Sequence, residues 1–345
     1  MGFRLSNLKS EYIFPDRYEK NVGNPRFAFV TFLMRNDNYL PGALMYAYGL
    51  RKKGTGADLV CMVSGNISDR AKEALELIYD HVVDMDEIYV KHKRGHERQD
   101  IPYVFTRFNT LRLGPDGDLG FGYEKIVVGD ADLLPIRFYD HLLTLDTPAG
   151  IINEKKENFM DYDENLEYIV PDSVWESGTW RWHYVYGDVC PHGTRIPKEL
   201  TDRVMTDHEN LGINSSLFVL SPSMDEFNRI IEDIKRPKVK KLVEADFNWP
   251  EMQYATMTWS GKWTSIDVRF SGLNGYPEPS VLCGIHFAGI KPWNARDEKS
   301  MKRVMKFPDY SLWYGMYEEM LDEYPGLMDN SKLVRLLELI GKNRR

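Results

Sequence analysis

Short apolar runs alternate with amphipathic segments through the first third of the chain. The amphipathic segments at residues 39–53 and 68–78 predict helices, with Pro41 in the first turn of one and Ser68 as a cap for the other. The apolar runs, rich in β-branched and aromatic residues, predict strands at 27–33, 58–63, 82–90 and 126–128. This alternation predicts a mostly parallel sheet with right-handed crossovers.

The pattern continues less regularly toward the C-terminus. Ser223 and Glu226 form a capping-box signature ahead of an amphipathic helix. Further apolar runs predict strands at 149–153, 212–220 and 281–287, and helical spacing predicts helices at 104–113, 250–253 and 311–342. Residues 154–209 show weak periodicity and many aromatic residues, which indicates either an acceptor-binding region or an insertion packed on the core.

Composition narrows the possible functions. The 345 residues carry a net charge of −8, which argues against nucleic acid as the main partner because no basic field would attract a phosphate backbone. The three cysteines lack metal-like spacing and fit a reducing compartment. No stretch reads as a signal peptide or membrane span, so the sequence predicts a cytoplasmic protein without a membrane span.

Two carboxylates follow the strand at 126–128. Gly129 ends the strand, and Asp130 and Asp132 come next, one residue apart. The carboxyl end of a central strand is where open α/β sheets bind ligands. Two carboxylates this close repel each other unless a cation lies between them, and a hard divalent ion suits their oxygen atoms. The pair therefore predicts a metal site.

Two later stretches carry groups that suit the same site. His286 ends an apolar run, where its imidazole can reach the metal from the other side, although such a histidine is often structural. Gly289 permits close approach of a phosphate to the backbone, and Lys291 supplies a cation for a diphosphate leaving group. Asn214 and Ser215 can present polar groups to a sugar, or they serve plain turn chemistry.

The end of the first strand offers a nucleoside site. Thr31 and Tyr39 are candidates to hold a base and its ribose; the alternative is an ordinary strand-to-helix turn. The turn lacks G-x-G-x-x-G, so a Rossmann dinucleotide enzyme is not expected. Residues 91–100 are highly charged and predict a loop.

Taken in order, these motifs resemble glycosyltransferase family 8, the glycogenin-like enzymes. The resemblance runs from about residue 27 to residue 293. It rests on Phe-Val-Thr ending at Thr31, Asn36-Asp37-Asn38-Tyr39, Pro41-Gly42-Ala43-Leu44, Thr106-Arg107-Phe108, Asp130-Ala131-Asp132, Asn214-Ser215-Ser216 and His286-x-x-Gly289-x-Lys291-Pro292-Trp293.

The resemblance implies a retaining enzyme of GT-A fold that uses a UDP-sugar, UDP-glucose first, with Mn²⁺ or alternatively Mg²⁺. It assigns the metal to Asp130, Asp132 and His286. It assigns donor binding to Thr31, Asn36, Tyr39, Arg107, Asp130, Ala131, Asp132, Gly289 and Lys291, and catalysis to Asn214, Ser215, Gln253 and Lys291. The family's acidic motif after Asn-Ser reads Trp249-Pro250-Glu251-Met252-Gln253 here, so Glu251 or Gln253 substitutes.

The expected architecture is a single α/β domain of GT-A (Rossmann-like) type with a mostly parallel mixed sheet flanked by helices. It comprises an N-terminal arm at 1–25, the transferase domain at 26–300 with an acceptor-side insertion at 154–209, and C-terminal helices at 301–345 that pack on the domain. A homodimer is a weaker expectation.

Three alternatives stay open at this point. A sugar-nucleotide pyrophosphorylase shares the sheet and the acidic pair, but residues 35–38 do not form its Gly-rich basic loop. A self-glucosylating primer protein of glycogenin type needs an acceptor tyrosine, for which Tyr276 is a weak candidate. A non-catalytic sugar-binding protein would not need both aspartates, His286 and Lys291. The acceptor is a glycan, a protein or a small polyol.

Overall fold

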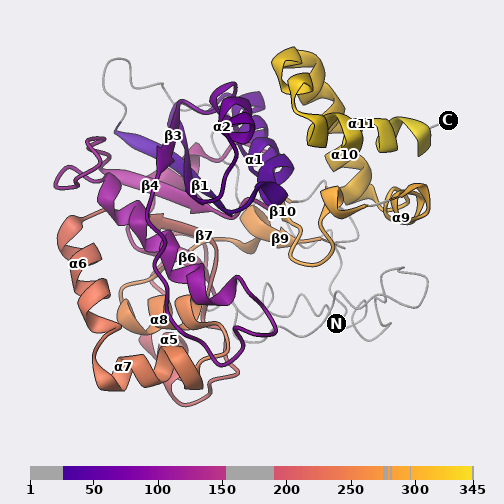
Figure 1. Ribbon diagram of the computed structural model, residues 1–345. Helices are drawn as coiled ribbons and strands as arrows, with labels where there is room; N and C mark the ends of the chain where they lie inside the picture. The colour runs from indigo at the N-terminus through magenta and orange to yellow at the C-terminus, as the bar shows by residue number, and fades with distance from the viewer. Residues whose placement is uncertain (1–25, 153–189, 275–278, 280–281, 296, 344–345) are drawn as a thin grey trace.

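Apolar runs at the centre of the chain assemble into one large sheet. The computed structural model describes residues 26–152, 190–274, 279, 282–295 and 297–343. Figure 1 shows the strands running through the middle of the molecule with helices on both sides. The seven strands are β1 (Phe27–Arg35), β2 (Asp58–Gly65), β3 (His81–Asp84), β4 (Lys125–Gly129), β6 (Ala149–Ile152), β7 (Ile213–Leu220) and β8 (Thr264–Ser265).

The strand order is β3-β2-β1-β4-β7-β6-β8. Neighbours from β3 to β4 are parallel, β7 runs antiparallel to both β4 and β6, and β8 is parallel to β6. This confirms the mostly parallel mixed sheet. A second, small sheet contains β5 (Leu133–Pro135), β10 (Gly284–His286) and β9 (Gly272–Leu273) in that order.

Alternate residues of each strand point to opposite faces, and each face has its own core. Phe29 and Leu33 of β1 belong to the core under the helices α1 (Leu40–Lys52), α2 (Asp69–Glu76), α10 (Pro308–Glu323) and α11 (Ser331–Asn343). Ala28 and Val30 belong to the opposite core, under the 3₁₀ helix η3 (Ile101–Leu113) and the helices α6 (Met224–Asp233) and α8 (Pro250–Thr258).

Shorter elements complete the described chain. They are η2 (Asp37–Tyr39), η4 (Asp140–Thr144), α5 (Lys198–Asp202), η5 (Arg203–Met205), α7 (Pro237–Lys241), the π-helix η6 (Leu242–Asp246), η7 (Val268–Ser271), η9 (Pro292–Asn294), α9 (Glu298–Val304) and η10 (Pro325–Asp329).

Both predicted helix caps are present. The Ser68 side chain accepts a hydrogen bond from Ala71 N, and the Ser223 side chain accepts one from Glu226 N. The Glu226 carboxylate accepts from Arg229 and from the Trp259 indole instead of closing the box. Each serine thus satisfies one of the orphan amides at the start of its helix.

Several predicted boundaries are wrong. The strand expected at 82–90 ends at Asp84, and the helix expected at 104–113 is a 3₁₀ helix that begins at Ile101. Directly after Asp132 the chain forms β5, which the sequence does not predict and which pairs with β10. The helix that Pro250 opens continues to Thr258.

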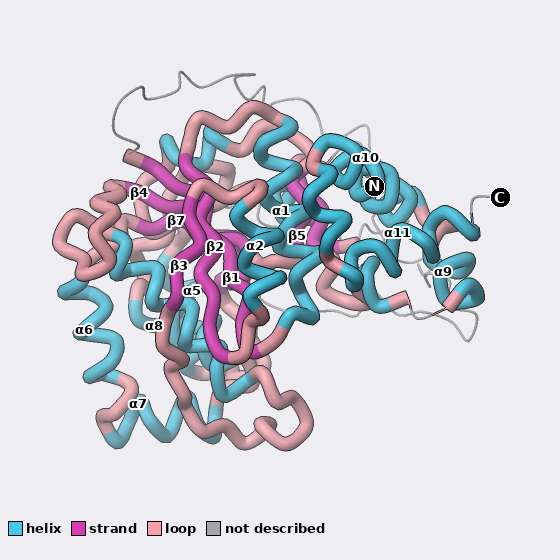
Figure 2. The backbone as a smooth tube through the Cα atoms, turned by 45° about the horizontal axis from the view of Figure 1, so that its top comes forward, coloured by secondary structure: helices cyan, strands magenta, loops and turns pink. Residues whose placement is uncertain are grey.

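Of the C-terminal helices, α10 packs against α1, and α11 packs against α9 and α10 (Figure 2). The Tyr48 hydroxyl of α1 donates to Glu323 of α10 over 2.9 Å. Lys332 of α11 donates to Asp37 O and to Asn38 Oδ1, so this helix also supports the turn after β1. The N-terminal arm, most of the 154–209 insertion and Tyr276 lie outside the described residues.

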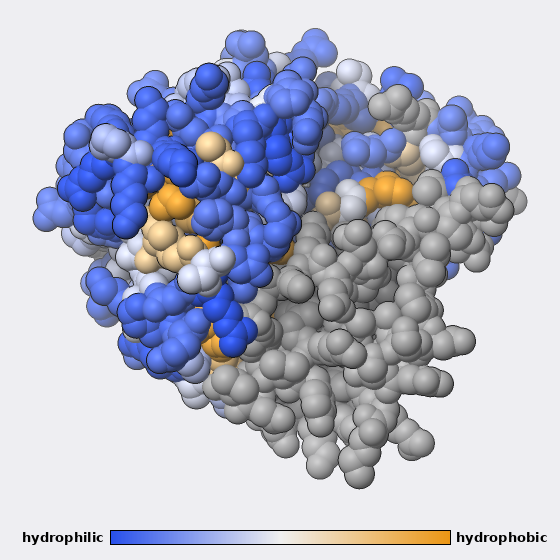
Figure 3. Space-filling view, turned by 90° about the horizontal axis from the view of Figure 1, so that it is seen from below, coloured by the Kyte–Doolittle hydropathy of each residue, from blue (hydrophilic) through white to orange (hydrophobic). Residues whose placement is uncertain are grey.

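No helix in the described part of the chain is both long and apolar enough to cross a membrane. The described surface in Figure 3 is mostly hydrophilic, with small apolar areas.

Candidate active site

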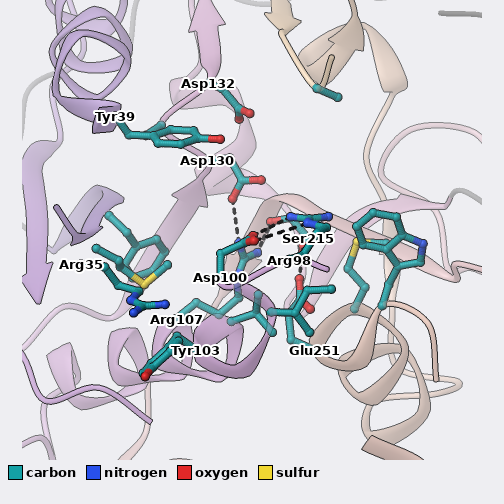
Figure 4. A pocket seen from close by; sticks show the side chains of 18 of the residues that line it. Arg35, Tyr39, Arg98, Asp100, Tyr103, Arg107, Asp130, Asp132, Ser215 and Glu251 are labelled. Atoms are coloured by element: carbon teal, nitrogen blue, oxygen red, sulfur yellow. Dashed lines mark hydrogen bonds and ion pairs between the residues drawn. The ribbon is translucent and has the colours of Figure 1, made fainter. Parts of the chain in front are cut away.

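A cavity opens at the carboxyl ends of β1 and β4. It encloses about 660 Å³. Its walls come from the β1 turn, the loop before η3, the segment after β4, the start of β7, the start of α8 and the loop after β10. Figure 4 shows the side chains converging from these elements. This is the position at which open α/β sheets bind ligands.

Asp130 and Asp132 stand on a tight turn between β4 and β5. The backbone amide of Asp130 donates to Ser216 O of β7, and the amide of Leu133 donates back to Asp130 O, both over 3.0 Å. Gly42 of α1 lies against this turn, because a Cβ there would come within 2.3 Å of Ala131 O. The turn is therefore fixed from both sides, and Gly42 permits the close approach of the helix.

The small sheet brings His286 to the two aspartates. His286 of β10 pairs with Leu133 of β5, and the amide of Phe287 donates to Asp132 O over 2.9 Å. His286 Nε2 then lies 3.3 Å from Asp132 Oδ1. One ligand atom from each of Asp130, Asp132 and His286 lies within 4.8 Å of the others. The structure thus brings the three predicted metal ligands together.

The donor set fits a divalent metal ion. Two carboxylates and an imidazole form a mixed set of oxygen and nitrogen donors, which suits a divalent transition-metal ion. The buried Nδ1 of His286 has no hydrogen-bond partner among the described residues, so this imidazole is not fully used by the fold. Asp132 and His286 are buried, while about a quarter of the Asp130 side chain (27%) is exposed toward the cavity.

Lys291 neutralises Asp132. Its ammonium, from the loop after β10, donates to Asp132 Oδ2 and to Phe287 O. Burial opposes ionisation of Asp132, but Lys291 and His286 together hold the pKa of that carboxyl below its ordinary value. The same ammonium lies 5.9 Å from the ring centroid of Tyr39. Lys291 thus links the acidic pair to the β1 turn.

Arg107 holds the other aspartate. It projects from η3, is buried, and donates to Asp130 Oδ1 over 2.7 Å and to Ser215 O. Burial alone would lower the pKa of the guanidinium, but Asp130 and Glu251 raise it, so the group stays charged. One end of the cavity thus carries two carboxylates, each paired with its own cation.

The chain is similar in sequence to several known proteins. No protein-family model matches the chain. Protein R707 of Acanthamoeba polyphaga mimivirus is 27% identical over 319 residues, covering 86% of this chain and 96% of R707. Galactinol synthase 6 of Arabidopsis thaliana is 22% identical over 319 residues, covering 89% and 85%. Glycogenin of Neurospora crassa is 33% identical over 117 residues, covering 33% of this chain and 16% of that protein.

The chain resembles glycosyltransferase family 8, and its similarity to glycogenin and to galactinol synthase supports that resemblance. Among solved structures, the galactosyltransferase LgtC in complex with donor and acceptor sugar analogs superimposes with a TM-score of 0.49 at 12% identity, covering 84% of this chain and 94% of LgtC. The resemblance to the family rests on sequence similarity alone. The fold is described by the strand order of the two sheets given above.

The residues expected on the sugar side divide into two groups. Asn214 and Ser215 line the cavity, and Ser215 Oγ donates to Glu251 Oε1 over 3.0 Å. Gln253 is fully buried and does not line the cavity. Its side chain accepts from Trp249 N and donates to His208 O and Asn210 O. The structure thus places Glu251, and not Gln253, in the cavity wall, while Gln253 fixes the start of α8.

The residues expected on the nucleoside side also divide. Asn36 and Tyr39 line the cavity. Thr31 is fully buried, and its hydroxyl donates to Gly129 O over 2.7 Å. The expected contact between Thr31 and a base is corrected, because β1 continues to Arg35 and leaves Thr31 in mid-sheet. Gly289 is half-buried in the loop after β10 and is not among the lining residues, whereas Ala131 and Lys291 are.

The sequence did not point to one wall of the cavity. Its lining residues are Arg35, Arg98, Asp100, Tyr103 and Trp249. Arg98 pairs with Asp100 and lies 5.1 Å from the Trp249 ring centroid. The density of charge in residues 91–100 was the available signal, and it predicted only a loop.

Proposed function

We propose that this protein is a metal-dependent retaining glycosyltransferase that moves a hexose from a UDP-sugar to a hydroxyl acceptor. UDP-glucose is the first candidate for the donor. The observation that carries the proposal is the convergence of Asp130, Asp132 and His286, with Lys291, at one end of a cavity large enough for a nucleotide sugar.

Asp130, Asp132 and His286 would hold the metal ion, Mn²⁺ or alternatively Mg²⁺. When bound, the ion supplies positive charge that favours departure of the nucleoside diphosphate. Lys291 contributes in the same direction, because its buried ammonium lies at the acidic pair and charge builds on the leaving oxygen in the transition state. Arg107 holds Asp130 in place through the 2.7 Å ion pair.

A second part of the cavity, which Arg107 links to Asp130 through Ser215 O, suits the donor sugar. Glu251 is a buried carboxylate positioned by Ser215, and Asn214 lies beside them. A carboxylate here faces the positive charge that develops at the anomeric carbon when the bond to the diphosphate breaks. Retention of configuration then follows either from a covalent intermediate on Glu251 or from attack on the same face. Glu251 thus replaces Gln253 in the proposed catalytic set with Asn214, Ser215 and Lys291.

We further propose transfer to a separate acceptor. The match to the Neurospora glycogenin covers 16% of that protein, whereas the match to galactinol synthase 6 covers 85%. This pattern supports an enzyme that acts on a glycan, protein or small polyol more than a self-glucosylating primer. The transferase domain at 26–300, the acceptor-side insertion at 154–209, the helices at 301–345, the cytoplasmic location and the homodimer remain predictions.

The proposal is tested by incubating purified protein with Mn²⁺ and a panel of UDP-sugars, with UDP release and intact mass as readouts. We expect slow UDP release from one donor without mass gain, because the donor is hydrolysed while its acceptor is missing. Mass gain in hexose-sized steps would instead establish self-glycosylation. Asp84→Asn, an exposed aspartate of β3, is the matched control for Asp130→Asn and Asp132→Asn.

Two results would contradict the proposal. One is the absence of turnover and of nucleotide binding with every donor, which leaves a non-catalytic protein. The other is full activity of a folded Asp130→Asn/Asp132→Asn double variant, which removes the metal assignment.

A further inference from the structure

Arg35 has an unusual backbone conformation at the edge of the cavity. It is the last residue of β1 and has φ of +68°, the one positive value at a non-glycine position in the described ranges. This left-handed region disfavours a side chain with a Cβ, and glycine or asparagine are its usual occupants. Residues kept in such conformations cluster at ligand sites. An arginine here therefore points to a function of its side chain.

The Arg35 side chain is held in place before any ligand binds. Its guanidinium carbon lies 4.1 Å from the ring centroid of Tyr103, and its Nη1 donates to Gln99 O. Tyr103 is in turn packed edge-on against Tyr89, with ring centroids 5.4 Å apart. Stacking and one hydrogen bond fix the plane of the guanidinium and leave further N–H donors available.

No carboxylate in the described part of the chain forms an ion pair with Arg35. This distinguishes it from Arg98 and Arg107, the other arginines of the cavity wall, which pair with Asp100 and Asp130. Arg35 thus presents positive charge to the cavity without a carboxylate to balance it, and Gln99 O accepts from only one of its N–H groups. The complementary ligand group is planar and carries carbonyl oxygens.

The position of Arg35 indicates which part of the donor it meets. Lys291, at the diphosphate end, lies 5.9 Å from the Tyr39 ring centroid, and Tyr39 follows Arg35 by four residues. Figure 4 shows Tyr39 projecting toward the aspartates and Arg35 next to Tyr103, away from Glu251. If the sugar extends from the diphosphate toward Glu251, the nucleoside extends along Tyr39 toward Arg35.

We propose that Arg35 recognises the nucleobase of the donor, and that it selects uracil over cytosine by donating to the base carbonyl at position 4. This inference rests on the proposed function, since it assumes a nucleoside diphosphate in the cavity. Uracil has a carbonyl oxygen at that position, whereas cytosine has an amino group that cannot accept from a guanidinium, which only donates. Arginine reads carbonyl oxygens of bases in the same way in nucleic-acid complexes.

The test compares the affinities of UDP and CDP, which differ only at position 4 of the base and in the hydrogen on the adjacent N3, by calorimetric titration in the presence of Mn²⁺. We expect the wild-type protein to bind UDP about tenfold more tightly than CDP, the ratio that corresponds to one good hydrogen bond. Arg35→Met keeps the length and the contact with Tyr103 but removes the donors. This variant should bind UDP about tenfold more weakly than the wild type and bind CDP with nearly the same affinity. The ratio of the two affinities should then be close to one. Arg35→Lys should keep most of the affinity for UDP and lose most of the preference for UDP over CDP.

The matched control is Arg94→Met. Arg94 stacks on Trp249 with its guanidinium 5.4 Å from the ring centroid, yet it does not line the cavity. Its ratio of UDP to CDP affinity should equal that of the wild type. Glycine is compatible with the left-handed backbone, so Arg35→Gly should melt at a temperature no lower than that of the wild type. It should still lose the preference for UDP over CDP. This variant therefore separates an effect on base recognition from an effect on folding.

Three results would overturn the inference. Equal weakening of UDP and CDP by Arg35→Met would place the guanidinium on the phosphates. Unchanged affinities in all Arg35 variants would remove it from the nucleotide site. Failure of the wild-type protein to bind either nucleotide would overturn the proposed function itself, and this inference with it; the wild-type titration alone distinguishes that case.

Discussion

Lys291 and Asp132 form a buried ion pair between residues 159 positions apart in the chain. The carboxylate that the proposal assigns to the metal therefore already has a cation on it. Burial lowers the pKa of the Lys291 ammonium, but Asp132 raises it further, so the group stays protonated. Metal ion and ammonium must share one carboxylate.

Lys291→Met should tighten the binding of Mn²⁺ in the absence of nucleotide. The substitution removes a like charge next to the metal site and leaves Asp132 without its cation, so the dissociation constant of Mn²⁺ should fall by about tenfold. The affinity for UDP in the presence of Mn²⁺ should fall at the same time. Electron paramagnetic resonance of free Mn²⁺ measures the first, and calorimetry the second.

Lys52→Met is the control for that experiment, because Lys52 pairs with Glu319 at the exposed contact between α1 and α10. It should bind Mn²⁺ as the wild type does. Weaker Mn²⁺ binding by Lys291→Met would show that the ammonium supports the metal site and does not compete for it.

The two aspartates should differ in their effect on stability. Asp132→Asn leaves the buried Lys291 ammonium without its carboxylate, so the free energy of unfolding should fall by about 3 kcal/mol. Asp130 is more exposed and its partner Arg107 keeps the bond to Ser215 O, so Asp130→Asn should cost about 1 kcal/mol. Urea unfolding without metal measures both, and equal losses would contradict the difference in burial.

Glu251 and Gln253 should separate catalysis from folding. Glu251→Gln keeps the volume and a hydrogen-bond acceptor for Ser215, so stability should change little while UDP release falls by about a hundredfold. Gln253→Ala breaks three buried hydrogen bonds at the start of α8 and should cost about 3 kcal/mol. Thermal melts and UDP release on both variants test the assignment. If Gln253→Ala melts at the same temperature as the wild type but has lost activity, Gln253 is the catalytic residue.

A histidine pair away from the cavity should make stability depend on pH. His192 Nδ1 accepts from Asp267 N, so the neutral ring carries its proton on Nε2 and donates to His141 Nε2 over 2.9 Å. Burial lowers the pKa of His192 from 6.5 to about 4. The unfolded chain therefore binds more protons between these values, and stability present above pH 6.5 is lost as the pH falls toward 4.

The expected loss between pH 7 and pH 4.5 is about 2 kcal/mol from this residue. Urea unfolding at the two pH values measures it. His192→Asn keeps an acceptor for Asp267 N but cannot titrate. Between the two pH values, the free energy of unfolding of this variant should therefore fall by about 2 kcal/mol less than that of the wild type. A variant with the same pH dependence as the wild type would assign the effect to other groups.

The sequence predicted the parts of the site that stand at strand ends. β1 and β4 are continuous apolar runs, and a polar residue that directly follows such a run is placed at the edge of the sheet. Asp130 and Asp132 were found this way, and His286 for the same reason. Thr31 was misplaced because the exact end of a strand is not visible in its composition: β1 extends two residues beyond the predicted Leu33.

Other features depended on contacts distant in sequence. Glu251 and Gln253 are two residues apart on α8 and therefore point in directions about 200° apart, so only one of them faces the cavity. The phase of the helix decides which, and it is set by packing against β7. The left-handed conformation of Arg35 has no signature in the sequence, since arginine rarely adopts it.

The pairing of β5 with β10 also orders events during synthesis. A ribosome makes the chain from the N-terminus, so the two aspartates emerge long before His286 and Lys291 exist. A nascent chain that stops before β10 contains the acidic pair and Arg107, the partner of Asp130, but lacks the imidazole and the ammonium, so Asp132 has no cation beside it. If the three residues hold a metal ion as proposed, its capture is a late event in the life of the chain and requires that translation has passed β10.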